Sequence, residues 1–149
     1  MKTLITYFSA KGTTKKIAEA VADECGIDKF EIIPCEPYTD ADIKYVNPLA
    51  RCNKEKIGKK DVPVAGKIEN FEEYDRIFVG FPIWYGGAPN VINTFCKDYD
   101  FTGKDVVAFA TSAASPIGNT AQKLSEYVKG AKSLDAVLVH NEAELKALL

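Results

Sequence analysis

A short polar stretch near the start of the chain has the residue types of an anion site. It reads Ser9, Ala10, Lys11, Gly12, Thr13 and Thr14, and it follows an apolar run directly. Hydroxyls and free backbone amides donate hydrogen bonds to phosphate, and glycine lets a ligand approach the backbone. A helix beginning here would add the positive end of its dipole. The spacing is neither Gly-Lys-Ser/Thr nor Gly-x-Gly-x-x-Gly. Two interpretations remain: a phosphate cradle, or a loop in which Thr13 or Thr14 only caps the helix.

A second stretch, 82–89, places Trp84 and Tyr85 side by side among glycines and prolines. Large aromatic side chains in a loop are costly to leave in water unless they contact something. One interpretation is contact with a flat aromatic cofactor. The other is that the pair packs on a neighbouring loop as part of the core.

A third stretch, 111–118, consists largely of small residues. Small side chains leave room for backbone amides and hydroxyls to meet the polar edge of a planar ring. Such loops are common, so this signal is weak by itself. The joint occurrence of the three stretches favours a binding site.

The elements that position these stretches alternate between strand and helix. We expect strands at 4–8, 30–33, 76–81, 106–110 and 136–139. Helices are expected at 17–25 with Gly26 as the stop, from Pro89 to Cys96, from 121 to 128 with Gly130 as the stop, and from Asn141 to the end. Asn141 and Glu144 have the spacing of a capping box. Another short helix, at 40–45, is possible within an irregular excursion from 35 to about 66.

This alternation predicts a parallel sheet with helices on both faces. In such sheets ligands bind beyond the carboxyl ends of the strands, beside the point where strand order reverses. The three stretches follow the first, third and fourth expected strands. They are therefore expected at one edge of the sheet.

Composition sets the broad class of protein. The chain has 149 residues, 46% of them hydrophobic and 27% charged, with a formal net charge of -2. We expect one domain spanning 1–149. There is no basic stripe for nucleic acid, no apolar run long enough for a membrane span, and no signal-peptide pattern at the start. A cytoplasmic location is the expectation.

Cysteine and histidine give little sign of chemistry. Cys25 and Cys96 fall on expected apolar helix faces and are predicted to be buried. Cys35 and Cys52 lie in irregular sequence, where a redox role stays open. His140 stands at an expected strand end without a partner, which argues against a metal site. No catalytic side-chain set can be assembled, so no catalytic residue is predicted.

In the order and spacing of its three stretches the chain resembles the flavodoxins. It is most similar to short flavodoxin-like proteins with Pro-x-Trp-aromatic-Gly-x-x-Pro in the second loop. The resemblance implies a flavodoxin-like doubly wound α/β sandwich, with a five-stranded parallel sheet of order 2-1-3-4-5 and one non-covalent FMN. Ser9 to Thr14 would hold the phosphate. The residues implied along the isoalloxazine are Pro82, Ile83, Trp84, Tyr85 and Gly86 on one side, and Thr111, Ser112, Ala113 and Ala114 on the other.

The chain departs from the usual flavodoxin pattern in two loops. Lys11 and Thr13 replace the threonine and asparagine of Ser-x-Thr-Gly-Asn-Thr, and Lys11 either reaches the phosphate or points to water. Ala113 and Ala114 stand where glycines are common. The third loop also lacks an aromatic residue, which would leave one ring face open to a substrate or a nicotinamide.

These features support two functions. The first is a one-electron carrier between a reductase and an acceptor enzyme, working as a monomer or weak dimer. The alternative is an FMN-dependent NAD(P)H oxidoreductase that acts on quinones or similar small molecules. A receiver domain of the same topology is disfavoured, because it needs acidic residues after the first strand and an aspartate ending the third. Ser9 and Pro82 stand near those places.

Overall fold

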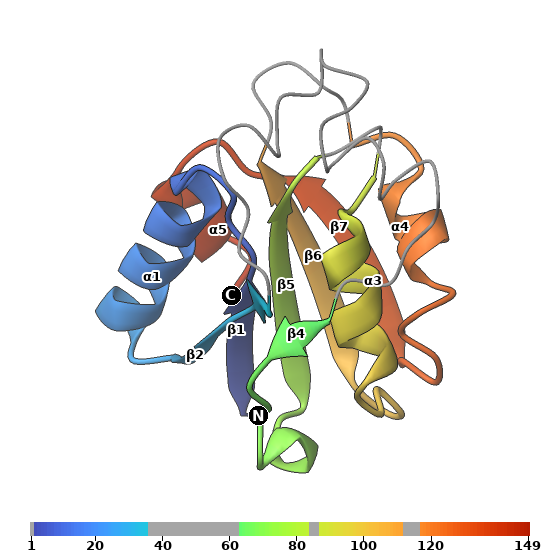
Figure 1. Cartoon of the computed structure of the whole chain (residues 1–149). Coiled ribbons are helices and arrows are strands. Elements are labelled where there is room, and N and C mark those ends of the chain that lie inside the picture. The colour runs from blue at the N-terminus through green and yellow to red at the C-terminus, as the bar shows by residue number, and fades with distance from the viewer. Residues whose placement is uncertain (1, 36–62, 84–86, 112–116) are drawn as a thin grey trace.

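A five-stranded parallel sheet runs through the middle of the molecule (Figure 1). The computed structural model describes residues 2–35, 63–83, 87–111 and 117–149. The strand order is β2-β1-β5-β6-β7, which is the predicted order 2-1-3-4-5. The strands are β1 (Thr3–Tyr7), β2 (Asp28–Glu31), β5 (Arg76–Pro82), β6 (Asp105–Thr111) and β7 (Ser133–Leu138). The fold class predicted from the sequence is confirmed.

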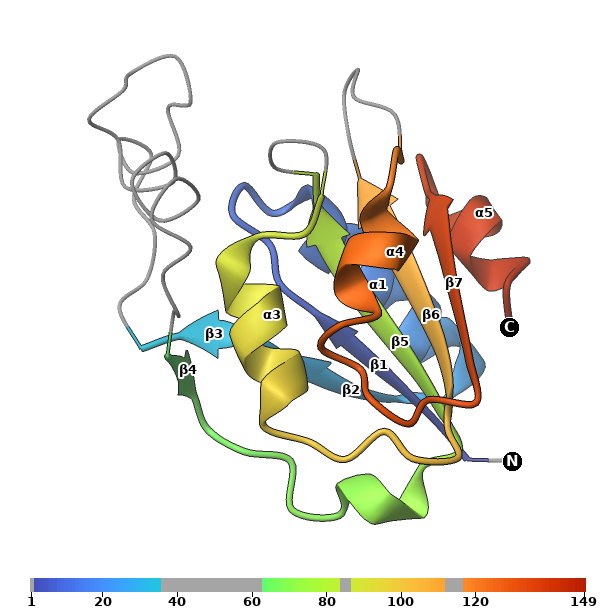
Figure 2. The ribbon, with the colours of Figure 1, turned by 90° about the vertical axis from the view of Figure 1, so that its right-hand side faces the viewer.

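Helices cover both faces of this sheet (Figures 1 and 2). On one face lie α1 (Thr13–Cys25) and α5 (Glu142–Lys146), and on the other lie α3 (Asn90–Lys97) and α4 (Thr120–Leu124). The buried side chains form two clusters that follow this division. Within β5, Ile77 and Val79 pack in the α3 cluster, and Phe78 between them packs in the α1 cluster. From Ile77 to Phe81 the strand contains only apolar residues and glycine, as expected for a strand buried on both faces.

Helix α1 packs its apolar stripe on the sheet. Its buried residues include Ile17, Ala18, Val21 and Ala22, and Gly26 ends it in the left-handed conformation at φ 66°. The prediction that Cys25 is buried was wrong, because this residue is exposed. At about 100° per residue, position 25 lies between Val21 and Ala18 around the helix, so it is on the predicted face. Residues 23–26 are all exposed, so the end of α1 extends beyond the packed part of that face.

The helix expected from 121 to 128 is shorter than predicted. Helix α4 ends at Leu124, where the Ser125 hydroxyl donates to the carbonyl of Gln122 at 2.6 Å. After it, the amide of Tyr127 donates to the carbonyl of Leu124, three residues earlier, at 2.9 Å. Val128 is nevertheless buried. Leu124 and Val128 are thus both buried, although turns and not a helix connect them. The apolar periodicity therefore did not reveal where the helix ends.

A small antiparallel ribbon stands beside the main sheet and was not predicted. The expected strand 30–33 divides at Ile32 into β2 and β3 (Ile33–Pro34), and β3 pairs with β4 (Val64–Ala65). The amide of Cys35 donates to the carbonyl of Pro63 at 2.9 Å. The chain therefore leaves this ribbon and returns to it at the same place. The possible helix at 40–45 and most of the 35–66 excursion lie outside the described residues.

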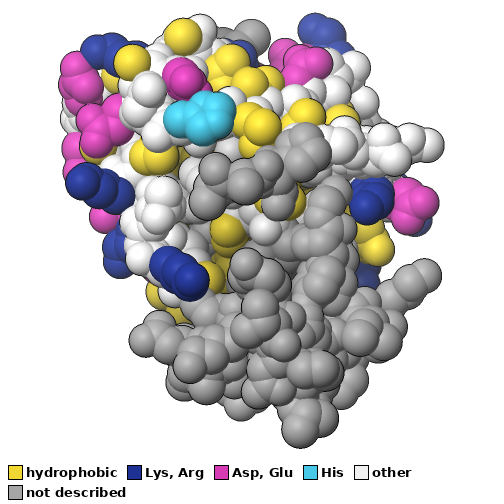
Figure 3. Space-filling model, turned by 90° about the horizontal axis from the view of Figure 1, so that it is seen from above, with side chains coloured by type: hydrophobic (Ala, Val, Ile, Leu, Met, Phe, Trp, Pro, Cys, Tyr) yellow, Lys and Arg dark blue, Asp and Glu magenta, His cyan; other side chains and the backbone are white. Residues whose placement is uncertain are grey.

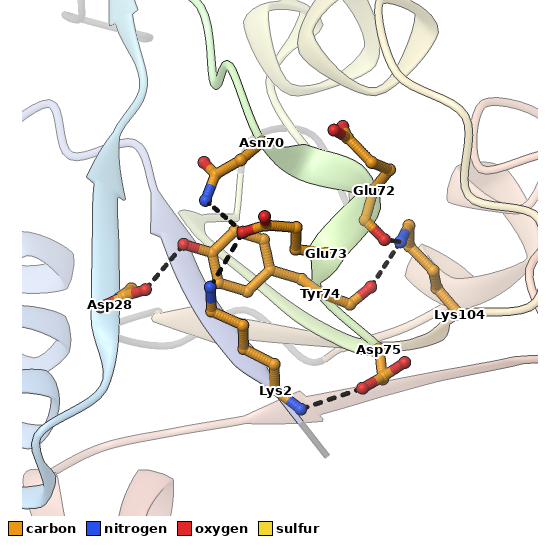
Figure 4. A network of polar contacts seen from close by, with 8 residues as sticks. All are labelled: Lys2, Asp28, Asn70, Glu72, Glu73, Tyr74, Asp75 and Lys104. Carbon is orange, nitrogen blue, oxygen red and sulfur yellow. Dashed lines mark hydrogen bonds and ion pairs between the residues drawn. The ribbon is translucent and has the colours of Figure 1, made fainter.

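A polar network closes the amino edge of the sheet, before β1, β5 and β6 (Figure 4). Lys104 is 7% exposed, and its ammonium donates to the carbonyls of Tyr74 and Glu72. The Tyr74 hydroxyl donates to Asp28 at 2.7 Å, and the Lys2 amide donates to Asp75 at 3.0 Å. These contacts join the strand starts at the end of the sheet opposite the three loops.

Candidate functional site

The predicted site lies at the carboxyl edge of the sheet, where the strand order reverses. From β1 the chain connects to β2 on one side, and β5 lies on the other side of β1. The ladder continues past β1, because the amide of Phe8 donates to the carbonyl of Gly80 at 2.9 Å. Figure 3 looks onto this edge. An open α/β sheet binds ligands at such a switch point.

The first loop forms an uncapped helix start. Gly12 is the N-cap of α1 in the left-handed conformation at φ 92°, and its amide donates to Oγ of Ser9 at 2.9 Å. The carbonyl of Gly12 accepts the first helical bond, from Lys16 at 3.0 Å. The amides of residues 13–15 precede that bond, so they have no acceptor within the helix. A Cβ placed on Gly12 would meet nothing within 4 Å, so the space beside this loop is open.

The charges around this helix start suit an anion. The first turn of α1 carries no acidic residue, and no side chain caps the helix. The interpretation of Thr13 or Thr14 as the cap is therefore wrong. Lys11 and Lys16 are exposed, while Lys15 forms an ion pair with Glu31 at 3.1 Å, which raises the pKa of Lys15. The dipole of α1 is thus left without a negative neighbour in its own first turn.

The three loops meet at Thr111, the last residue of β6. Its Oγ1 lies 2.7 Å from Oγ1 of Thr14 in α1, a contact that joins residues 97 positions apart. Its carbonyl accepts a hydrogen bond from the amide of Ile83 at 3.0 Å. Pro82, the last residue of β5, is its partner in the strand register. The structure thus brings the start of α1, the end of β5 and the end of β6 together.

The predicted site residues differ in how far the structure describes them. Ser9 and Ala10 are half-buried, and Lys11, Gly12 and Thr13 are exposed. Thr14 and Thr111 are buried, and Pro82 and Ile83 are half-buried. The remaining predicted residues lie outside the described part of the chain, and these are Trp84, Tyr85, Gly86, Ser112, Ala113 and Ala114.

Comparisons with known proteins identify the family. A model of the flavodoxin family matches residues 2–148. The chain belongs to the flavodoxin family. A candidate flavoprotein from Bacteroides eggerthii shares 38% identity with this flavodoxin at a TM-score of 0.89, covering 99% of this chain and 95% of that chain. The comparison with curated proteins gave no match.

Two further structures extend the comparison. A flavoprotein from Lactobacillus acidophilus, solved in complex with FMN, is 26% identical at a TM-score of 0.76, covering 98% of this flavodoxin and 97% of that chain. A flavodoxin from the domain Archaea is 19% identical at a TM-score of 0.52, covering 99% of this chain and 93% of that chain. This last similarity concerns the fold alone.

A pocket that the sequence did not reveal lies beside the first loop of this flavodoxin. It is lined by residues 8–10, which follow β1, and by residues 31–34, which run from the last residue of β2 through β3. Neighbouring parallel strands end at the same edge of a sheet. The end of the second predicted strand could therefore have been expected beside the first loop. One wall includes Glu31, the ion-pair partner of Lys15.

The described cysteines and the histidine can be placed by their burial and contacts. Cys96 is fully buried, as predicted, and burial raises the pKa of its thiol. Cys35 is exposed, and Cys52 lies outside the described residues. His140 has a partner after all, because its Nδ1 lies 3.0 Å from Oε2 of Glu144. Within the described segments, no group of three or more His, Cys, Asp or Glu side chains is arranged to hold a metal ion.

None of the helices in the described residues of this flavodoxin is long and apolar enough to cross a membrane.

Proposed function

We propose that this flavodoxin binds FMN non-covalently at the carboxyl edge of its sheet and carries electrons between a reductase and an acceptor enzyme. The observation that carries the proposal is the start of α1. It has no acidic residue and no side-chain cap, and it faces open space at Gly12. A phosphate monoester is the type of ligand that such a helix start accepts.

The donor set of the first loop fits the FMN phosphate. The amides of residues 13–15 and the hydroxyls of Ser9 and Thr13 would donate to it, with Lys11 and Lys16 adding positive charge nearby. The FMN-bound flavoprotein from Lactobacillus acidophilus supports this choice of cofactor. Along the isoalloxazine we place residues 82–86 and 111–114, as the resemblance implied. When bound, FMN supplies the redox chemistry.

A carrier needs no catalytic side chains, because the flavin supplies the redox chemistry. The Cys96 thiol is buried with a raised pKa, and the imidazole of His140 is held by Glu144. The described residues of the site donate hydrogen bonds, set the local charge and position loops. We expect a monomer or weak dimer that meets its redox partners at this edge.

The test is reconstitution of the purified protein with FMN, and separately with riboflavin, followed by removal of excess ligand. We expect retained visible absorption with FMN and weaker retention of riboflavin, which lacks the phosphate. Equal affinity for both would contradict the phosphate site. If the protein retains neither FMN nor riboflavin, the proposal that it binds FMN is wrong.

A second measurement addresses the role in electron transfer. Stepwise reduction with dithionite should resolve two one-electron steps in a carrier, and NADPH alone should be consumed slowly. Rapid, sustained NADPH oxidation in the presence of a quinone would instead support the oxidoreductase and overturn the carrier.

A further inference from the structure

Thr111 contacts two of the proposed FMN-binding segments and begins the third. Its side chain reaches Thr14 at 2.7 Å, in the first turn of α1. Its carbonyl accepts from Ile83 at 3.0 Å, and the chain beyond it enters the third loop. Thr111 therefore links the start of α1, in the phosphate portion of the proposed site, with the end of β5, in the ring portion.

The bond between the two hydroxyls is protected from water. Thr14 is 1% exposed and Thr111 is 6% exposed. Among the described residues, no buried side-chain nitrogen or oxygen lacks a hydrogen-bond partner. Loss of one hydroxyl would leave the other facing a methyl group, which costs more than loss of a solvated hydrogen bond. The start of α1 is thus held against the end of β6.

We propose that Thr111 is a positioning residue that fixes the distance between the phosphate and ring portions of the site through Thr14. The proposal rests on the proposed FMN function. FMN spans both portions in one molecule, so its affinity depends on their spacing. Inorganic phosphate and riboflavin each use one portion, so their affinities depend on it less.

The test is Thr111→Val, which removes the hydroxyl and keeps the branched shape. We expect FMN affinity to fall about three- to tenfold, the equivalent of one buried hydrogen bond. Binding of inorganic phosphate to the apoprotein, measured by calorimetry, should change less than about twofold. Riboflavin binding, measured by fluorescence, should fall less than FMN binding, because riboflavin does not reach the phosphate portion. Thr111→Ser keeps the hydroxyl and should restore FMN affinity.

A double-mutant cycle tests whether Thr111 acts through Thr14. Thr14→Val should weaken FMN binding to a similar extent. The double variant, with valine at both positions, should bind FMN no more weakly than either single variant, because both remove the same bond. Additive losses would overturn the coupling of the two hydroxyls.

Thr6→Val is the matched control for loss of a buried hydroxyl. Thr6 lies within β1 at 0% exposure, and its hydroxyl donates to the carbonyl of Phe78 at 2.8 Å. It belongs to the same sheet but not to the site. Loss of this hydroxyl in Thr6→Val should lower the stability of the protein and leave the ratio of FMN affinity to riboflavin affinity unchanged.

Failure of this proposal can be distinguished from failure of the proposed function. If the unaltered protein does not bind FMN, both are overturned. If it binds FMN and Thr111→Val binds FMN equally well, only the positioning role is overturned. The same holds if Thr111→Val loses FMN, riboflavin and phosphate in equal proportion, because that pattern indicates general destabilisation.

Discussion

The ring of Phe109 occupies the space that a side chain at position 80 would need. Gly80 and Phe109 are partners in the register of β5 and β6, and a Cβ on Gly80 would lie 2.2 Å from Cζ of Phe109. Phe109 is fully buried in the cluster beneath α1. A glycine inside a strand commonly marks such a close approach. Here it provides the space for an aromatic ring under the helix that begins at the proposed phosphate site.

Gly80→Ala is therefore expected to destabilise the protein. The added methyl group must displace a buried ring, which costs about 1–3 kcal/mol in a packed core. Urea unfolding followed by far-UV circular dichroism measures the loss. Combining Gly80→Ala with Phe109→Leu should recover part of it, so the double variant should be more stable than the sum of the single effects implies. A Gly80→Ala variant as stable as the unaltered protein would contradict this account.

Thr13→Asp is expected to have opposite effects on stability and on FMN binding. The residue is exposed in the first turn of α1, which holds no acidic group. A carboxylate there should stabilise the apoprotein by about 0.3–1 kcal/mol through the helix dipole. It should also repel the FMN phosphate and lower FMN affinity about tenfold or more, because nearby like charges interact by about 1–4 kcal/mol.

The comparison with Thr13→Asn isolates the charge in this experiment, since asparagine has the same shape without the negative charge. Thermal unfolding and flavin fluorescence give the two readouts. Riboflavin affinity should stay unchanged in both variants, and added salt should reduce the difference in FMN affinity between them. An equal loss of FMN and riboflavin on introducing aspartate would show that phosphate does not bind at the start of α1.

The sheet and the first loop could be predicted because their signals are local. Apolar runs such as 4–8 and 106–110 correspond to strands, and alternation with helices implies parallel order. The polar stretch after the first strand had to lie at the carboxyl edge. Gly26 marked the end of α1, where the structure has left-handed backbone, whereas the start of the helix at Gly12 was not predicted.

The contacts that hold the site together could not be predicted in the same way. The bond between Thr14 and Thr111 spans 97 positions, and no periodicity connects the two residues. Strands β3 and β4 have two residues each, too few for an alternating pattern. Position 25 fits the apolar spacing of α1, but residues 23–26, at the end of the helix, are all exposed. Each of these features depends on packing between distant segments, which a single sequence does not display.

Glu144→Gln should flatten the acid side of the stability profile. The amide of His140, and then its side chain, hold the pKa of Glu144 below the ordinary 4.5. Because the folded pKa is lower than the unfolded pKa, the carboxylate stabilises the fold above pH 4.5 and loses this effect as pH falls through the folded value. The melting temperature of the variant should therefore decline less steeply below that pH.

Asn141 provides the control for this experiment. Its Oδ1 accepts from the amide of Glu144 at 2.9 Å, which caps α5 as the sequence predicted. Asn141→Ala should lower stability by about 0.5–2 kcal/mol through loss of the cap and leave the acid dependence in place. Identical pH profiles for Glu144→Gln and the unaltered protein would show that this carboxylate has the same pKa in both states.

The redox potential of bound FMN should reflect the small net charge of the chain. At -2 the protein opposes the negative charge of the fully reduced flavin only weakly, so we expect its low-potential couple to be less negative than is usual for flavodoxins. Lys11→Glu changes the local charge beside the proposed phosphate site and should make this couple more negative. Lys11→Met, which changes the charge by one unit instead of two, should give an intermediate shift.

Potentiometric titration of the unaltered protein and both variants gives the three potentials, and raising the salt concentration should bring these values together. A very low potential in the unaltered protein, or no shift in Lys11→Glu, would mean that hydrogen bonds and stacking at the ring set the potential instead of nearby charge.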